Sequence, residues 1–158
     1  EKKNSFLKKE NIFIFLIILF CAFLDRYTKN EVISNFSENV FFINNFINID
    51  LIWNTGIGFG FLSTESSLFY NLVSALVGVV IIVLCYITII SEVADKLIYA
   101  IIIGGAIGNF YDRLIFNAVP DFIDLHYDRY HWFTFNVADI FITLGIIIFL
   151  TNEFLKNK

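Results

Sequence analysis

Four long apolar stretches constrain the fold of this chain more than any other feature. A helix needs about 20 mostly apolar residues to cross the roughly 30 Å hydrocarbon core of a bilayer. The stretches cover residues 12–29, 68–90, 97–114 and 135–151. Only 16% of the chain is charged and 58% is hydrophobic, against about 25% and about 45–50% in soluble domains. We therefore expect a polytopic α-helical membrane protein with four transmembrane helices in a single membrane-embedded domain, residues 1–158.

The lysine and arginine residues predict the orientation, because cytoplasmic segments carry an excess of them. With both termini cytoplasmic, the inside set is Lys2, Lys3, Lys8, Lys9, Lys96, Lys156 and Lys158, and the outside set is Arg26, Lys29, Arg113 and Arg129. The first stretch follows a basic flank but lacks a small-residue cleavage site, so we expect it to stay as an anchor. Residues 31–66 and 115–134 are then extracytoplasmic.

The segment that follows the first stretch shows the alternation of a β-strand. Within residues 46–54, one face carries Ile47, Ile49, Leu51 and Trp53, and the other carries Asn48, Asp50 and Asn54. Glycines at positions 56, 58 and 60 end this pattern. We expect a small extracytoplasmic β-sheet between helices 1 and 2, with its apolar face on the membrane surface.

The third stretch ends in polar residues, which are costly in lipid and usually face the interior of a helix bundle. Gly104 and Gly108 form a pattern that is typical of close helix packing. Asn109, Asp112 and Arg113 follow at spacings of i, i+3 and i+4, which place them on one helix face. Two interpretations stay open for Asp112 and Arg113: an ion pair at the membrane interface, or a place in a functional site.

The fourth stretch begins with a polar stripe on an otherwise apolar helix. Asn136, Asp139 and Thr143 lie at i, i+3 and i+7 and are predicted to share one face. An aspartate near a helix N-terminus is favoured by the helix dipole. That effect explains Asp139 alone, and the whole stripe favours a functional interpretation.

A second aspartate, Asp121, precedes the fourth stretch. Pro120 and Asp121 are common turn residues, so a simple turn is one interpretation. The apolar neighbours of Asp121 favour another, in which its surroundings disfavour the charged form. Two carboxylates that lie together share one proton, so that one acts as a base and the other as an acid. Asp121 and Asp139 are therefore candidates for aspartic-type hydrolysis.

Other classes of site have little support in the sequence. It contains no H-E-x-x-H motif and no zinc-like Cys/His spacing, and we expect no metal and no cofactor. We interpret the group Asp124, His126, Asp128 and His131 as a solvated loop. The net charge of −4 argues against a nucleic-acid partner. Cys21 and Cys85 lie in separate apolar stretches and are predicted to be small core residues without a disulfide.

Five ordered motifs resemble the lipoprotein signal peptidase family, also called signal peptidase II. They are Asp25, Thr28 and Lys29; Asn54, Thr55, Gly56, Gly58, Phe59 and Gly60; Gly104, Gly105, Ala106, Gly108, Asn109, Asp112 and Arg113; Val119, Asp121 and Phe122; and Phe135, Asn136, Ala138 and Asp139. The resemblance covers about residues 25–145. The chain departs from the family at Gly58, where alanine is usual, and at Arg26, where glutamine is frequent.

The resemblance implies a multi-pass protease of the bacterial cytoplasmic (inner) membrane, with its active site at the extracytoplasmic face. It would remove signal peptides from diacylglyceryl-modified prolipoproteins by cleaving just before the lipidated cysteine. The catalytic aspartates of the family match Asp121 and Asp139. Its substrate-binding positions match Asn54, Asn109, Arg113 and Asn136, and Asp25, Lys29, Gly56 and Asp112 match structural supports. Asp25 and Lys29 lie at i and i+4, a spacing that predicts an ion pair. The expected partners are the prolipoprotein and membrane lipid, and we expect a monomer.

Two other functions use the same polar residues. A small proton-coupled carrier would use Asp139 and Asp112 as a proton relay. Relay carboxylates are expected near the bilayer midplane, and carriers often contain inverted repeats, whereas these aspartates are predicted at one interface and no repeat is visible. A non-catalytic assembly factor would use the face that carries Gly104 and Gly108, and it leaves the pairing of Asp121 with Asp139 unexplained.

Overall fold

The computed structural model describes residues 9–56 and 67–156. It contains the four expected helices: α1 (Lys9–Asn35), α2 (Ser67–Ile90), α3 (Val93–Phe116) and α4 (Val137–Lys156). All four are long and apolar enough to cross a membrane, which confirms the four predicted spans. The expected glycine-rich turn at Gly58 and Gly60 lies outside the described residues. Helix α1 extends beyond the predicted span at both ends, and α4 begins two residues later than predicted.

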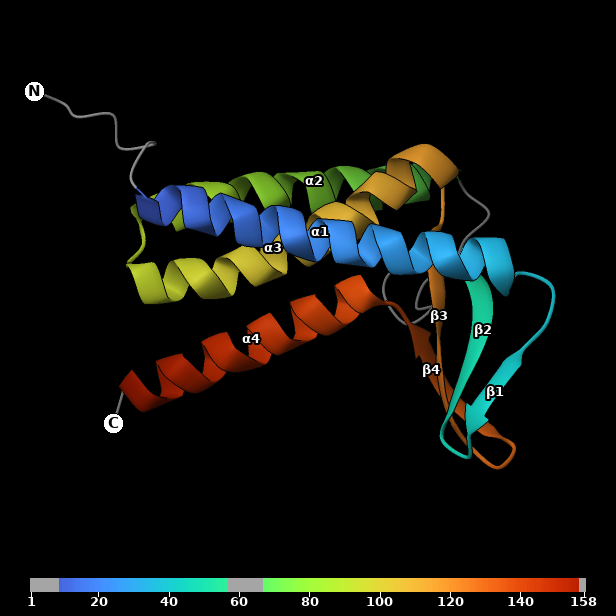
Figure 1. The fold of residues 1–158 in the computed structure, drawn as a ribbon. Helices are drawn as coiled ribbons and strands as arrows, with labels where there is room; N and C mark the ends of the chain where they lie inside the picture. The colour runs from blue at the N-terminus through green and yellow to red at the C-terminus, as the bar shows by residue number, and fades with distance from the viewer. Residues whose placement is uncertain (1–8, 57–66, 157–158) are drawn as a thin grey trace, which may run out of the picture.

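Helix α3 is the centre of the bundle, and α1, α2 and α4 all pack against it (Figure 1). Its glycines permit this close approach. A β-carbon at Gly104 would overlap Cys21 and the backbone of Ile18 in α1, and one at Gly105 would overlap the carbonyl of Ala138 in α4. The predicted role of Gly104 in close helix packing is therefore confirmed, and Cys21 is a buried free thiol as predicted.

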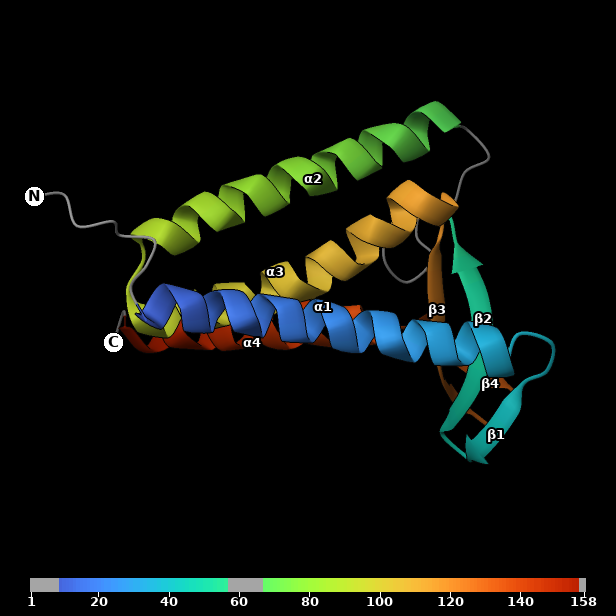
Figure 2. The ribbon, with the colours of Figure 1, turned by 45° about the horizontal axis from the view of Figure 1, so that its top comes forward.

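A four-stranded antiparallel sheet covers one end of the bundle (Figures 1 and 2). Its strands are β1 (Phe41–Asn44), β2 (Ile47–Asn54), β3 (Val119–Tyr127) and β4 (Tyr130–Phe135), in that spatial order. The sheet that we expected between helices 1 and 2 is present there as β1 and β2. It also contains β3 and β4, which lie between α3 and α4, where we predicted no strand. The pairing of β2 with β3 joins residues about 70 positions apart, and local sequence patterns carry no signal for such a contact.

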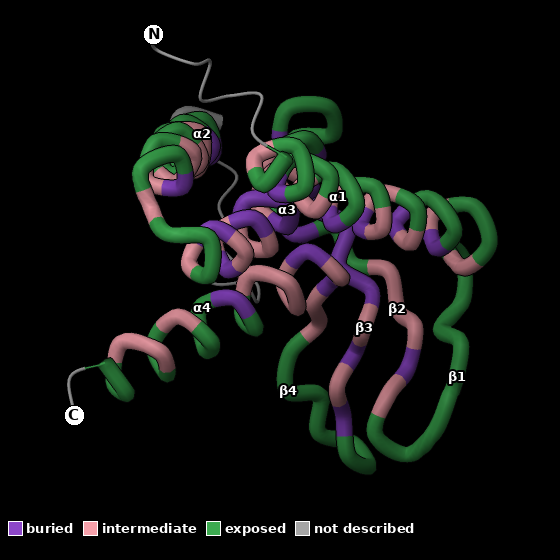
Figure 3. Tube along the Cα trace, turned by 60° about the vertical axis from the view of Figure 1, so that its left-hand side comes forward, coloured by how far each residue is buried: buried purple, intermediate pink, exposed green. Residues whose placement is uncertain are grey.

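The polar side of β2 is the side that faces inward. Asn48 and Asn54 are buried, whereas Ile52 and Trp53 are exposed. The pairing with β3 shifts register between Ile49 and Ile52, so the strand does not keep the strict alternation that we predicted. Figure 3 shows the result across the sheet: β3 is largely buried, and β1 is exposed along its length.

The histidine-rich segment is a hairpin of β3 and β4 and not a solvated loop. Asp124 is only 2% exposed and His126 is also buried, which contradicts the prediction for both. His131 Nδ1 lies 2.7 Å from Asp124 Oδ2. Within residues 9–56 and 67–156, no group of three or more His, Cys, Asp or Glu side chains has a geometry that could hold a metal ion.

Candidate active site

Asp121 and Asp139 meet at the junction between the sheet and the bundle. Asp121 belongs to β3, so the turn interpretation of residues 120–121 was wrong, and Asp139 lies in the first turn of α4. Both carboxylates line one cleft of about 330 Å³. The other residues that line it are Asn54, Val73, Val77, Ala106, Asn109, Arg113, Val119, Ile142, Thr143 and Ile146. The cleft is therefore a mostly apolar groove with a few polar groups gathered at the two carboxylates.

Asn136 joins the two aspartates. It is not part of the helical stripe that we predicted, because α4 begins one residue later and Asn136 caps it. Asn136 Oδ1 accepts the N–H of Asp139 at 3.0 Å, and Asp139 Oδ2 accepts the N–H of Asn136 at 3.1 Å, which is a reciprocal capping arrangement. Asn136 Nδ2 donates to Asp121 Oδ1 at 2.6 Å. Asn136, the N-cap of α4, is thus hydrogen-bonded to both carboxylates and holds them in position.

The surroundings of Asp121 favour its protonated form. Asp121 Oδ2 also accepts a hydrogen bond from Asn54 Nδ2 at 2.8 Å. Burial is the main cause that raises the pKa of Asp121 to about 7, and the negative charge of Asp139 raises it further. The hydrogen bonds from Asn54 and Asn136 act in the opposite direction, because they stabilise the carboxylate. Near neutral pH, Asp121 therefore exists in both protonation states.

Asp139 is held by a chain of polar contacts that reaches into α1. Asn109 Nδ2 donates to Asp139 Oδ1 at 2.8 Å, and Lys29 Nζ donates to Asn109 Oδ1 at 2.8 Å. Lys29 is fully buried between Asp25 and Asp112, with Nζ 2.7 Å from a carboxylate oxygen of each. The predicted pair of Asp25 with Lys29 is thus confirmed. Two carboxylates and one amide compensate the buried ammonium.

The same network holds the start of α4 in place. It also includes Arg26, to which the sequence alone gave no role. Asp25 Oδ1 accepts the N–H of Ala138 at 2.9 Å. Arg26 forms an ion pair with Asp112, and its guanidinium lies over the rings of Tyr111 and Phe116. The only signal at Arg26 was its departure from the family pattern. Asp112 therefore pairs with two cations of α1, and not with its neighbour in sequence as one interpretation had it.

Arg113 holds the chain that follows β2. Its Nη2 donates to the carbonyl of Gly56 at 2.7 Å, while the N–H of Gly56 donates to Asn54 Oδ1 at 2.9 Å. The guanidinium lies 5.5 Å from the ring centre of Tyr70, a residue that the sequence marked only as part of an apolar stretch. Arg113 Nη1 is buried and has no hydrogen-bond partner in the part of the chain that the structure describes. Arg113 is also one of the residues that line the cleft.

Fold and site together define a multi-pass membrane hydrolase of the aspartic-peptidase type. The family model described as Signal peptidase (SPase) II matches residues 17–155. A lipoprotein signal peptidase of Pelagibacter ubique (strain HTCC1062) is 42% identical over 154 residues, which cover 94% of this chain and 93% of the relative. One from Francisella tularensis subsp. novicida (strain U112) is 34% identical and covers 98% of both chains. The chain belongs to the signal peptidase II family.

Solved structures agree with this assignment. Two bacterial membrane enzyme structures, both 28% identical to this chain, superpose with TM-scores of 0.76 and 0.70. The first covers 92% of this chain and 89% of its own length, and the second covers 88% and 90%. The protein is an aspartic-type signal peptidase of a bacterial membrane and removes signal peptides from lipoproteins. The relatives do not favour a carrier.

Proposed function

We propose that Asp121 and Asp139 are the catalytic pair and that they cleave the peptide bond just before the diacylglyceryl-modified cysteine of a prolipoprotein. The observation that carries this assignment is Asn136, which hydrogen-bonds to both of the carboxylates that line one cleft. Such a pair holds one shared proton, which is the arrangement that activates water and protonates the substrate. The catalytic step needs no metal or cofactor.

In the proposed mechanism, Asp121 carries the shared proton and Asp139 is the base. Asp139 removes a proton from water, and the water oxygen forms a bond to the carbonyl carbon of the substrate. Asp121 donates its proton to the carbonyl oxygen, which gives a neutral tetrahedral intermediate. When the C–N bond breaks, the proton on Asp139 passes to the leaving amine, and one hydroxyl of the intermediate returns its proton to Asp121 as the carboxylic acid forms. The pKa of Asp121 near 7 suits a group that must release its proton during turnover.

The remaining polar residues take two roles in this proposal. Asn109 and Asn136 position the aspartates, since their amide groups are already bonded to them. Arg113 and Asn54 bind the substrate backbone. Arg113 lines the cleft, its Nη1 has no hydrogen-bond partner within residues 9–56 and 67–156, and this atom would bind a peptide carbonyl. Asp25, Lys29, Gly56 and Asp112 support this arrangement from outside the cleft.

We propose that this site lies at the extracytoplasmic face of the inner membrane, with both termini of a single-domain, monomeric enzyme in the cytoplasm. The beginning of α1 and the end of α4 lie together at one end of the bundle, and the sheet lies at the other (Figure 1). The bias of lysine and arginine residues puts the termini inside. The mostly apolar lining of the cleft is suited to a substrate that enters from the bilayer with its acyl chains still in lipid.

Substitution of either aspartate tests the catalytic assignment. Asp121→Asn and Asp139→Asn should each lower cleavage of a diacylated prolipoprotein by about 10³-fold or more, because one carboxyl group of the pair is lost. The measurement is the single-turnover rate in detergent. Asp128→Asn is the matched control, because Asp128 is an exposed aspartate of the β3–β4 hairpin with a φ of 53° that asparagine also adopts. Wild-type cleavage by either the Asp121 or the Asp139 variant would contradict the proposal.

The pH dependence tests which aspartate carries the proton. Cleavage should fall as the pH rises through about 7, because Asp121 then loses the proton that it donates. Asn54→Ala removes a hydrogen bond that lowers the pKa of Asp121, so the alkaline limb should move to higher pH even though the maximal rate is reduced. The measurement is kcat/KM against pH, because this ratio reports the pKa of the free enzyme. If the alkaline limb of Asn54→Ala stays at the same pH as that of the wild type, the group that titrates is not Asp121.

A further inference from the structure

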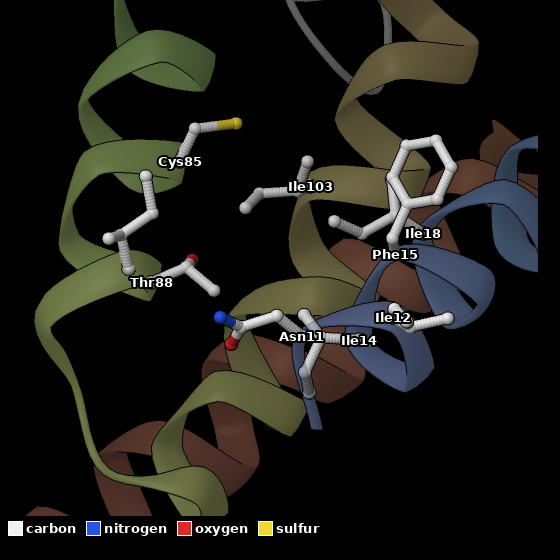
Figure 4. Close-up of a pocket in the computed structure, with 9 residues that line it drawn as sticks. Asn11, Ile12, Ile14, Phe15, Ile18, Cys85, Thr88 and Ile103 are labelled. Atoms are coloured by element: carbon white, nitrogen blue, oxygen red, sulfur yellow. The ribbon is translucent and has the colours of Figure 1, made fainter. Parts of the chain in front are cut away.

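A second hollow lies at the end of the bundle opposite the sheet. It has a volume of about 320 Å³, and it is separate from the cleft that holds the aspartates. Helices α1, α2 and α3 line it through Asn11, Ile12, Ile14, Phe15, Ile18, Cys85, Thr88, Ile89 and Ile103. Figure 4 shows apolar side chains from all three helices around this space, with Asn11 and Thr88 as its polar members. We call it the terminal groove.

The terminal groove exists because α1 and α2 hardly touch each other. Both pack on α3, and Figure 2 shows α2 standing apart from α1 along the bundle. Ile103 of α3 is fully buried and forms part of the floor. The walls belong to α1 and α2, whose other faces are exposed along predicted membrane spans. A hollow with apolar walls does not hold water well, and it binds apolar molecules.

A buried cation lies at the polar end of the terminal groove. Lys96 is 8% exposed, and its Nζ donates a hydrogen bond to Asn11 Oδ1 at 3.1 Å. Asn11 lines the groove, so this contact places the ammonium group at its edge. Lys96 lies in the first turn of α3, where the helix dipole disfavours a positive charge. The amide of Asn11 is neutral, and the N-terminal end of the helix dipole is positive. Neither of them compensates the positive charge of Lys96.

Lys96 differs in this respect from Lys29, the other buried lysine of the described helices. Lys29 is buried between two carboxylates, and Lys156 pairs with Asp95 and Glu153. No ion pair formed within residues 9–56 and 67–156 includes Lys96. Buried charges are normally paired, because an unpaired one loses its hydration without compensation. The position therefore fits an anionic group supplied from outside these residues.

We propose that the terminal groove binds one anionic phospholipid of the leaflet that surrounds this end of the bundle. One acyl chain lies between α1 and α2 along Phe15, Cys85 and Ile103, and the phosphate pairs with Lys96. The apolar walls select a lipid over a free phosphate ion. The ammonium of Lys96, which has no ion-pair partner within residues 9–56 and 67–156, selects an anionic headgroup over a zwitterionic one. The site is distinct from the catalytic cleft, which lies at the far end of α3.

Binding of matched lipids by the intact chain tests this proposal. The purified protein in detergent is titrated with phosphatidylglycerol or phosphatidylcholine of identical acyl chains, and bound lipid is counted by native mass spectrometry. We expect about fivefold tighter binding of phosphatidylglycerol. Lys96→Gln should abolish this preference, and Lys96→Arg should retain it. Lys9→Gln is the matched control, because Lys9 is an exposed lysine at the start of α1, and it should leave the preference unchanged.

A second pair of variants tests the groove itself and does not depend on Lys96. Cys85→Phe places a ring in the groove and should remove the tightly bound phosphatidylglycerol. Val83→Phe adds the same ring to the exposed side of α2 and should not. Cleavage activity should stay at the wild-type level in Cys85→Phe, which shows that the chain is folded.

Four outcomes would overturn the proposal. The first is equal binding of the two lipids by the wild type, and the second is an equal loss of lipid preference in Lys9→Gln and Lys96→Gln. The third is an equal loss of bound phosphatidylglycerol in the two phenylalanine variants. The fourth is displacement of the lipid by glycerol phosphate or by diacylated substrate. Equal lipid binding would mean ordinary annular lipid. Displacement by glycerol phosphate would mean a free-anion site, and displacement by substrate would mean that the groove belongs to the peptidase reaction.

Discussion

Helices α2 and α3 have the same length but opposite environments. Helix α2 carries no charged residue, and only 11% of its most apolar 18-residue stretch is buried in the protein. Helix α3 has the lowest mean hydropathy of the four spans, and 44% of its most apolar 18-residue stretch is buried. In a soluble protein, the more apolar helix would be expected at the centre. Here α2 keeps most of its apolar side chains exposed on a helix that is long enough to cross a membrane. Helix α3 instead carries glycines and polar groups that pack against other parts of the protein.

This difference shows how polarity is distributed in the molecule. The interior holds Asn109, Asp112 and Arg113, each paired with groups on other elements. The exposed surface of α2 instead presents side chains such as Leu76 and Ile82, which are more than half exposed. Buried polar groups are stable only when their partners are in place. Substitutions in α3 should therefore have larger effects than matched substitutions in α2.

The largest difference is expected between buried polar side chains of the two helices. Asp112→Asn removes the charge that compensates Lys29 and Arg26 and should lower the free energy of unfolding by about 3 kcal/mol. Ser74→Ala removes a buried hydroxyl of α2 that donates to the carbonyl of Tyr70 in its own helix, and it should cost less than about 0.5 kcal/mol. Thermal unfolding in detergent measures both, and equal effects would contradict the contrast between the helices.

A smaller difference is expected between two glycines. A β-carbon at Gly108 would overlap the carboxylate of Asp25, which is itself bonded to Lys29 and Ala138. Gly108→Ala should therefore cost about 1–3 kcal/mol and reduce cleavage, because the start of α4 shifts. A β-carbon at Gly78 in α2 would lie 3.1 Å from the tip of the Phe110 ring, which can move. Gly78→Ala should leave cleavage intact. A larger loss of cleavage activity in Gly78→Ala than in Gly108→Ala would contradict our interpretation of α3 as the tightly packed helix.

The smallest effect is expected at the lipid-facing surface. Leu76 is 63% exposed on α2, so Leu76→Ala should change the free energy of unfolding by no more than about 0.5 kcal/mol and leave kcat unchanged. Thermal unfolding and the cleavage assay measure this. A loss like that of a buried leucine, about 2–5 kcal/mol, would show that α2 packs against a protein partner and not against lipid.

Much of this architecture could be predicted from the sequence because it is local. A run of about 20 apolar residues has one stable solution in a bilayer, and four such runs indicated the four helices. The spacing of Asp25 and Lys29 indicated their ion pair, because both lie on one face of one helix. Gly104 indicated close packing, since a pattern of small residues records how near another helix comes.

The sheet and the connections of the site were decided by tertiary structure. Lys29 contacts Asn109 and Asp112 across 80 and 83 residues of sequence, and β2 pairs with β3 across a similar separation. No periodicity within one segment indicates which distant segment it will meet. Asn136 illustrates the limit: its spacing suggested a helical stripe, whereas the end of β4 places it one residue before α4, as a cap that reaches both aspartates.

The sequence by itself therefore determined that this chain lies in a membrane, that it has four spans, and which polar residues interrupt them. Tertiary structure alone decided that Asp121 and Asp139 share a cleft, and that burial and mutual repulsion bring the pKa of Asp121 to about 7. The physical reason is that hydropathy acts segment by segment. The protonation of a carboxyl group instead depends on every charge and hydrogen bond that the folded chain brings around it.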